Sequence, residues 1–233
     1  DNGDAPAQLA LVVHHYAIDG VSWRILLDDL KLLASNPDAN RIHDSLPLRV
    51  WAETLADQGA KGLRRNEESL WLSQVTEQSK LPIDTDDSSI ENTQADADDV
   101  RGELSTLQTE SLLKAPGVYG AGINEILLSA FGLALCKWSR DEFSYTFNDL
   151  VIHLEGHGRE SDLDLSQTLG WLTSVFPVKL EVSDLSPDNN GHLGFAIRRI
   201  KQLIQSMPDK GVGYGVLKYM DPESQVATAN TET

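Results

Sequence analysis

Three short segments of the 233-residue chain carry the residue types that proton-transfer chemistry needs. The first pairs adjacent histidines, His14 and His15, with an Asp19-Gly20 turn and ends at Trp23. Imidazole titrates near neutral pH, so a histidine at the end of an apolar strand suits general acid–base catalysis. On a strand the two histidines would point to opposite faces, so at most one enters a given site. The alternative is one core and one surface histidine before an ordinary turn.

The second segment runs from His153 to Glu160 and places a carboxylate between histidines at a predicted strand end. If the strand continues, His153, Glu155 and His157 share one face. Glu155, with Arg159 nearby, is then a candidate acid–base carboxylate, and the alternative is an ion-paired strand end. The residue order is not the His-Glu-x-x-His of zinc proteases, and a strand does not present ligands as a helix does. No metal site is therefore predicted.

The third segment, from Pro208 to Gly215, contains a Gly-x-Gly-x-Gly run. It is not a dinucleotide fingerprint, because a helical pattern precedes it and the residues that follow are too few for the required helix. The residues by themselves predict a mobile glycine-rich loop.

Helical and strand patterns alternate around these segments, which indicates a layered α/β or α+β domain. Apolar residues recur at three- and four-residue steps from Ser22 to Ala34, with Ser22 as a candidate N-cap. The pattern at 124–138 is apolar enough for a helix that is buried on most sides. Helices are expected at 22–34, 47–60, 63–78, 106–114, 124–138 and 190–207, and strands at 9–13, 100–104, 143–155 and 175–182.

Composition excludes several classes of function. Acidic residues outnumber basic ones 36 to 19, and a formal charge of −17 disfavours binding to nucleic acid or to an anionic membrane surface. No apolar run approaches the roughly 20 residues that span a bilayer, and the first residues are not signal-like. The single cysteine, Cys136, excludes an internal disulfide and a two-cysteine racemase, and it fits a cytoplasmic location.

Four blocks of sequence, taken in order, resemble the epimerization domain of non-ribosomal peptide synthetases, a branch of the condensation-domain superfamily. The run His14-His15-x-x-x-Asp19-Gly20 resembles the superfamily signature, and its continuation from Val21 to Leu27 resembles the epimerization branch. The other blocks are Glu155-Gly156-His157-Gly158-Arg159-Glu160, Thr168–Pro177 (with Leu172 where Phe is usual) and Pro208–Tyr219.

The resemblance implies a chloramphenicol-acetyltransferase-like fold with two lobes around a tunnel. A peptidyl carrier protein inserts a phosphopantetheine arm that bears an aminoacyl or peptidyl thioester, and the domain inverts its α-carbon from L toward D. The domain itself binds no cofactor. By resemblance His15 and Glu155 are catalytic, and Asp19 holds the histidine loop through an ion pair whose partner the sequence does not name. The supporting or site-lining residues are His14, Asp19, Gly20, Trp23, His157, Arg159, Trp171 and Tyr214.

The same resemblance predicts that the chain is a piece of a longer protein, without the first half of the N-terminal lobe and without a closing C-terminal segment. Residues 1–81 would be the remainder of that lobe, and 82–99 an acidic flexible connector. Residues 100–223 would form most of the C-terminal lobe, and 224–233 a polar tail. Neighbouring synthetase domains are expected partners besides the carrier protein.

Two alternatives to epimerization remain open. A related condensation or acyltransfer domain would use His15 as a base for an attacking amine. A truncated fragment would keep carrier docking without catalysis, and for the isolated chain this last alternative is favoured.

Overall fold

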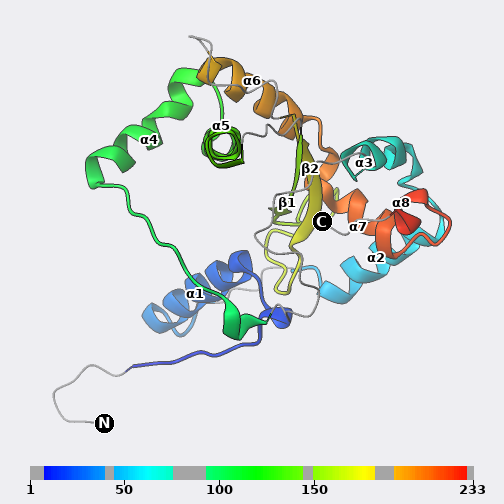
Figure 1. Ribbon diagram of the computed structural model, residues 1–233. Helices are drawn as coiled ribbons and strands as arrows, with labels where there is room; N and C mark the ends of the chain where they lie inside the picture. Colours follow the sequence, from blue (N-terminus) through cyan, green and yellow to red (C-terminus); the bar gives the residue numbers. More distant parts are fainter. Residues whose placement is uncertain (1–7, 40–44, 76–92, 144–148, 182–191, 230–233) are drawn as a thin grey trace. The chain divides into compact units, whose positions relative to one another are not determined.

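The computed structural model describes residues 8–39, 45–75, 93–143, 149–181 and 192–229 (Figure 1). The chain divides into two compact units, each assembled from separate stretches of sequence. The first unit contains 1–72, 153–176 and 208–229, and the second contains 73–152, 177–207 and 230–233. Every residue proposed for the site from the sequence belongs to the first unit. The lobe boundaries near 82 and 99 stay a prediction.

Helices dominate both units. In the first unit lie η1 (His15–Ala17), α1 (Gly20–Ser35), α2 (Leu48–Ala60), η2 (Arg65–Glu67), η5 (Pro208–Gly211), α7 (Val212–Tyr219) and α8 (Gln225–Thr228). In the second lie η3 (Gln94–Asp96), α4 (Thr106–Tyr119), α5 (Ile123–Phe143) and α6 (His192–Gln205). Helix α3 (Glu68–Val75) and the strands β1 (Leu150–Gly156) and β2 (Ser174–Leu180) are divided between the two.

The two strands pair into one two-stranded sheet (Figure 1). A Cβ atom on Gly156, the last residue of β1, would lie 2.6 Å from the Oγ atom of Ser174, the first residue of β2. The end of one strand therefore lies beside the start of the other, and the strands run antiparallel. The loop 157–173 that joins them carries most of two of the sequence blocks singled out above, Glu155–Glu160 and Thr168–Pro177.

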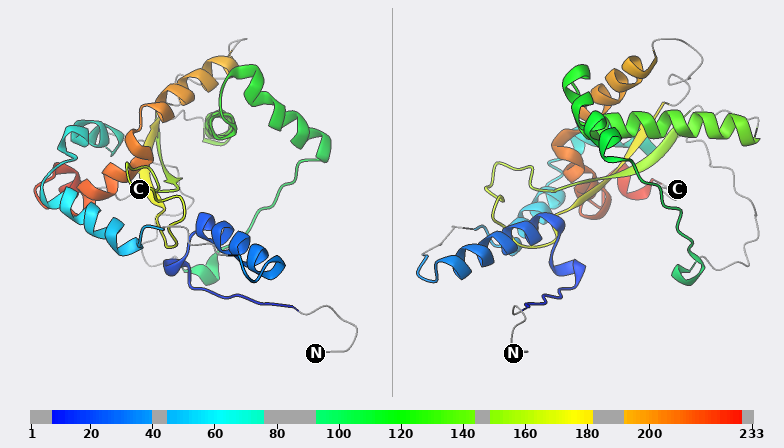
Figure 2. Two further views of the ribbon diagram at one scale, coloured as in Figure 1. Left: turned by 180° about the vertical axis from the view of Figure 1, so that it is seen from behind. Right: turned by 90° about the vertical axis from the view of Figure 1, so that its left-hand side faces the viewer.

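The core of the first unit forms where α2 packs against α7 (Figure 2). The predicted glycine-rich loop is wrong here, because the segment after Gly211 is a buried helix. Its Gly213 permits close packing, since a Cβ atom there would lie 2.0 Å from Glu67 Oε2. At the other side of this contact, a Cβ atom on Gly59 would lie only 2.5 Å from the Met220 carbonyl oxygen. The core residues are Trp51, Leu165, Leu172 and Val212, with Leu46, Leu55 and Leu163 packed against them.

In the second unit α5 packs against both α4 and α6 (Figure 2). Ser105 and Gln108 form a reciprocal capping box that starts α4. The prediction that the α5 segment is buried on most sides is wrong, because Leu127 and Phe131 are 48% and 46% exposed. Among the described residues no single helix is long and apolar enough to cross a membrane. Only α4 and α5 together pass that test, and they are bent by 104°.

Several predicted elements differ from the structure. Residues 9–13 and 100–104 form no strand, because a strand needs a hydrogen-bonded partner and the described residues supply none. Helix α5 continues to Phe143, so β1 starts later than predicted. The predicted polar tail instead begins with α8 and buries Val226 completely. Of the predicted acidic connector 82–99, residues 82–92 lie outside the described residues, and 93–99 contain the exposed turn η3.

Substituting Gly59 by Ala tests the close contact between α2 and Met220. Ala favours a helix over Gly by roughly 1 kcal/mol, yet at this position its methyl group would overlap backbone atoms. We expect Gly59→Ala to lower the free energy of unfolding by about 1–3 kcal/mol, measured by urea denaturation with tryptophan fluorescence. Gly117→Ala in α4 is the matched control, because a Cβ atom there meets nothing within 4 Å. Equal effects of the two substitutions would contradict the packing.

Candidate active site

A buried ion pair joins two of the sequence blocks. Arg159 donates from Nη1 to Asp19 Oδ2 (2.8 Å) and from Nη2 to Oδ1 (3.1 Å), with side chains that are 6% and 2% exposed. The same carboxylate accepts the backbone N–H groups of Ser22 (2.7 Å) and Leu172 (3.1 Å). Arg159 is thus the partner of Asp19 that the sequence left open. Asp19, and not Ser22 as predicted, is the N-cap of α1.

Ser22 instead connects the start of α1 to the loop after β1. Its hydroxyl donates to the Gly170 carbonyl oxygen (2.9 Å) and accepts from Arg159 Nη2 (3.0 Å) and from the Gly170 N–H (3.1 Å). Arg159 Nη2 also donates to the Thr168 carbonyl oxygen (3.0 Å), and Asp19 N–H donates to that of Gly170 (3.1 Å). The histidine loop and the block 168–177 are therefore fastened to each other through buried polar groups.

The electrostatics of Asp19 follow from this arrangement. Burial raises the pKa of its carboxyl group, but the hydrogen bonds from Arg159, Ser22 and Leu172 more than reverse this and lower the pKa to about 2. Asp19 is thus a fixed negative charge and not a proton donor near neutral pH. Its role in the fold is to hold the loop.

The two histidines of the first block differ in their hydrogen bonding. Predicted to lie on a strand, they instead lie at the start of a turn: His14 is the N-cap of η1 and His15 is its first residue. His14 Nδ1 accepts the Tyr16 N–H (3.1 Å), so it is committed to the backbone. The exposed His15 ring contacts the Trp171 ring (centroids 5.3 Å apart), on which Tyr16 also stacks (5.2 Å). Within the residues that the structure describes, neither ring nitrogen of His15 forms a hydrogen bond.

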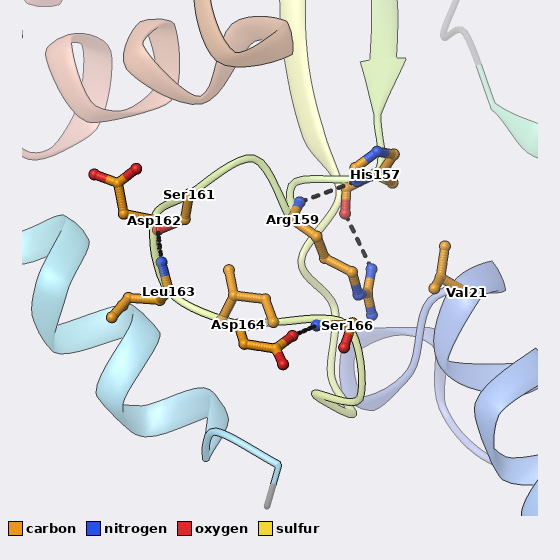
Figure 3. A pocket seen from close by; sticks show the side chains of 9 residues that line it. Val21, His157, Arg159, Ser161, Asp162, Leu163, Asp164 and Ser166 are labelled. Atoms are coloured by element: carbon orange, nitrogen blue, oxygen red, sulfur yellow. Dashed lines mark hydrogen bonds between the residues drawn. The ribbon is translucent and has the colours of Figure 1, made fainter.

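The side chains of the second block, Glu155–Glu160, also differ in their hydrogen bonding. His157 Nδ1 accepts the Arg159 N–H (3.1 Å), so the proton of the neutral ring lies on Nε2, which faces Glu160 Oε1 (3.1 Å). Lys210 Nζ also contacts Glu160 Oε1 (2.5 Å). His157 and Glu160 are therefore engaged with neighbouring groups. Figure 3 shows the His157–Arg159 contacts at the edge of the loop.

Glu155 is the other carboxylate of this block. It is exposed near the end of β1, on the same face as His153, and no hydrogen bond or ion pair to it occurs within the described residues. It shares the first unit with His15. Among its described residues this unit thus presents the Glu155 carboxylate and the His15 imidazole, together with His153, with unused hydrogen-bonding capacity. Carboxylate and imidazole are group types that can transfer a proton at carbon.

The other predicted site residues vary in accessibility. Gly20 begins α1 in open space, and Trp23 is half-buried on the same helix. Trp171 is exposed, whereas Tyr214 is buried on α7 with its ring 5.6 Å from that of Trp71. Two further charged residues were not predicted for the site: Lys210, which lies in the Pro208–Gly215 block and contacts Glu160, and Arg64, which pairs with Asp209 and for which no motif gave a signal.

An open depression of about 560 Å³ adjoins Arg159 on the loop that follows β1 (Figure 3). Arg159 Nε is buried without a hydrogen-bond partner in the part of the chain that the structure describes. No group of three His, Cys, Asp or Glu side chains in that part is arranged to hold a metal ion. The lining residues are Val21, His157, Arg159 and 161–166.

The condensation-domain family model matches residues 3–230. The chain belongs to the condensation-domain family of non-ribosomal peptide synthetases. It is 37% identical over 226 residues to one of the linear gramicidin synthase proteins of Brevibacillus parabrevis, covering 94% of this chain and 3% of that protein. It is 36% identical over 229 residues to a plipastatin synthase protein of Bacillus subtilis (strain 168), covering 94% and 9%. The chain thus spans less than a tenth of these two relatives.

Solved structures of this family give the fold. The epimerization domain from the third module of tyrocidine synthetase B matches with a TM-score of 0.76 at 29% identity, over 94% of this chain and 50% of that domain. The first condensation domain of the CDA synthetase matches with a TM-score of 0.59 at 15% identity, over 85% and 40%. The predicted α/β, chloramphenicol-acetyltransferase-like fold class is confirmed. The chain spans about half the length of the epimerization domain.

Replacing Asp19 by Asn tests the buried ion pair. We expect Asp19→Asn to lower the free energy of unfolding by about 3–5 kcal/mol near neutral pH, because Arg159 stays buried without its counter-charge. The pKa of Asp19 is lower in the folded state (about 2) than its usual value of 3.8, so its contribution is present above about pH 4 and is lost as the pH falls toward 2. Urea denaturation of both proteins across this range measures the difference.

Asp57→Asn is the matched control for this experiment, since Asp57 forms an exposed pair with Lys61 on α2. Its effect should stay below about 1 kcal/mol throughout. A difference between wild type and Asp19→Asn that does not shrink on acidification would contradict the assigned ion pair.

Proposed function

We propose that this domain epimerizes the α-carbon of an aminoacyl or peptidyl thioester that a peptidyl carrier protein presents on its phosphopantetheine arm. One observation carries the proposal. The chain shares 29% identity with the epimerization domain of tyrocidine synthetase B, against 15% with the first condensation domain of the CDA synthetase. The Glu155 and Thr168–Pro177 blocks, which resemble the epimerization branch, support it.

The free side chains of the first unit suit this reaction. A thioester acidifies its α-proton, yet that proton stays far less acidic than a carboxylic acid, so a positioned base must remove it. Removal forms an enolate, and returning a proton to the opposite face of the same carbon completes the inversion. Glu155 and His15 would be the two acid–base groups, either of which takes the proton first. A donor near the thioester oxygen would stabilise the enolate charge.

The residues that already form hydrogen bonds or ion pairs would support the site and would not transfer protons. Asp19 and Arg159 neutralise each other, so neither competes for the α-proton. His14 and His157 each use one ring nitrogen to accept a backbone N–H. The chain's own residues would therefore supply acid–base groups and their support, with no resident cofactor. The expected partners are the carrier protein and neighbouring synthetase domains, and binding to nucleic acid or membranes is not expected.

A condensation or acyltransfer reaction is the second candidate, because the matching family model is that of the condensation domain as a whole. In that reaction His15 would assist an attacking amine, and Glu155 would have no required role. The two candidates thus differ in their dependence on Glu155. A non-catalytic fragment that only docks the carrier would depend on neither residue.

Deuterium incorporation separates these possibilities. The native protein that carries this sequence is mixed, in deuterated water, with a carrier protein loaded with an L-aminoacyl thioester. We expect α-deuterium and the D-enantiomer in the released amino acid, detected by mass spectrometry and chiral chromatography. Glu155→Gln and His15→Ala should each slow inversion about 10²-fold or more, since each removes an acid–base group.

Glu53→Gln on α2 serves as a control, because it also neutralises an exposed glutamate, outside the site. It should leave the rate unchanged. Wild-type rates in both site variants would exclude the epimerization proposal. Peptide-bond formation without α-deuteration would support the condensation reaction instead.

A further inference from the structure

The turn η5 packs against the end of β1, the strand that carries Glu155. A Cβ atom on Gly156 would lie 2.7 Å from the Lys210 carbonyl oxygen, which also accepts a hydrogen bond from Ser174 Oγ (2.7 Å). Side chains alternate along a strand, so Glu155 faces away from this contact. The backbone of Lys210 thus backs β1 on the face opposite to Glu155.

The backbone of this turn is strained. Asp209 and Lys210 have φ values of +44° and +45°, a left-handed conformation that is uncommon for non-glycine residues and that Asp tolerates better than Lys. Arg64 pairs with Asp209, and Gly211 packs so closely that a Cβ atom there would lie 2.0 Å from the Phe176 ring. Backbone strain of this kind concentrates at functional sites, so the side chains that this turn carries are candidates for a functional role.

The turn presents the Lys210 side chain to the block that contains Glu155. Lys210 Nζ lies 2.5 Å from Glu160 Oε1 and 3.4 Å from His157 Nε2, and His157 Nε2 lies 3.1 Å from the same Glu160 oxygen. The side chains of Lys210, His157 and Glu160 form one cluster beside the end of β1. The ion pair between Lys210 and Glu160 therefore connects the turn η5 to the loop that follows β1.

We propose that Lys210 is a positioning residue for Glu155. Through its ion pair with Glu160 it keeps the turn pressed against Gly156, which fixes the backbone from which Glu155 projects. The same ion pair occupies Glu160, so that Glu155 is the carboxylate of the block left to react. The catalytic part of this inference rests on the proposed epimerization, whereas the bracing of the strand end does not.

Two measurements on the native protein test the proposal. Hydrogen–deuterium exchange mass spectrometry follows the backbone amides of 153–160, and α-deuteration of the loaded carrier protein gives kcat and KM. We expect Lys210→Met to speed amide exchange in this segment about two- to fivefold and to lower kcat by a similar factor, because the ion pair it removes is partly exposed, with KM for the carrier within about twofold. Lys210→Arg should restore both values, because it keeps the charge that pairs with Glu160.

A reversed pair and a surface control sharpen the test. Lys210→Glu alone should behave at least as badly as Lys210→Met, and adding Glu160→Lys should recover most of kcat. Lys61→Met removes an exposed lysine paired with Asp57 on α2 and should change neither measurement. Wild-type amide exchange in Lys210→Met, faster exchange with unchanged kcat, or equal impairment of the Met and Arg variants would overturn the proposal. If the wild-type protein shows no α-deuteration, the epimerization proposal fails, and amide exchange alone decides whether Lys210 braces the strand.

Discussion

The buried ion pair between Asp19 and Arg159 is the interaction on which the candidate site depends, because it joins residues 140 positions apart in the chain. Removing two charges from water costs several kcal/mol per ion, and only good geometry with further hydrogen bonds offsets that cost. Here Ser22, Leu172 and the Thr168 carbonyl complete the bonding. His15 precedes Asp19 by four residues, and Glu155 precedes Arg159 by four. One ion pair therefore brings the two candidate catalytic segments into one unit.

Close backbone packing accounts for Gly156 and Gly158, the two glycines of the Glu155 block. A Cβ atom on Gly158, whose φ is +64°, would lie 1.5 Å from the Leu172 carbonyl oxygen, and one on Gly156 would meet Ser174 and Lys210. Side chains at these positions would push the loop after β1 away from β2 and from η5. The glycines thus let three stretches of backbone come close enough to hold the segment that carries Glu155 and Arg159.

Hydrogen bonding then decides which polar residues are available for chemistry. His14 and His157 both have motif positions, yet each uses Nδ1 to accept a backbone N–H. Glu160 is held by Lys210 and His157, while Glu155 and His15 have no such hydrogen bond among the described residues. The hydrogen bonds and ion pairs of the neighbouring histidines and carboxylates therefore leave Glu155 and His15 as candidates for proton transfer.

The sequence by itself determined most helices and the fold family, because helical periodicity and capping residues act within a few positions, and short blocks of residues identify relatives. It predicted α1, α2 and β2 closely, but not the unpaired segments at 9–13 and 100–104, since a strand depends on a partner elsewhere in the chain. It misread 208–215 as a mobile loop, because glycine marks both turns and tight packing. Only the tertiary structure decided that Arg159 pairs with Asp19, that Ser22 binds Gly170, and that Lys210 lies behind Gly156. These contacts join distant residues through burial and geometry, which spacing along the chain does not encode.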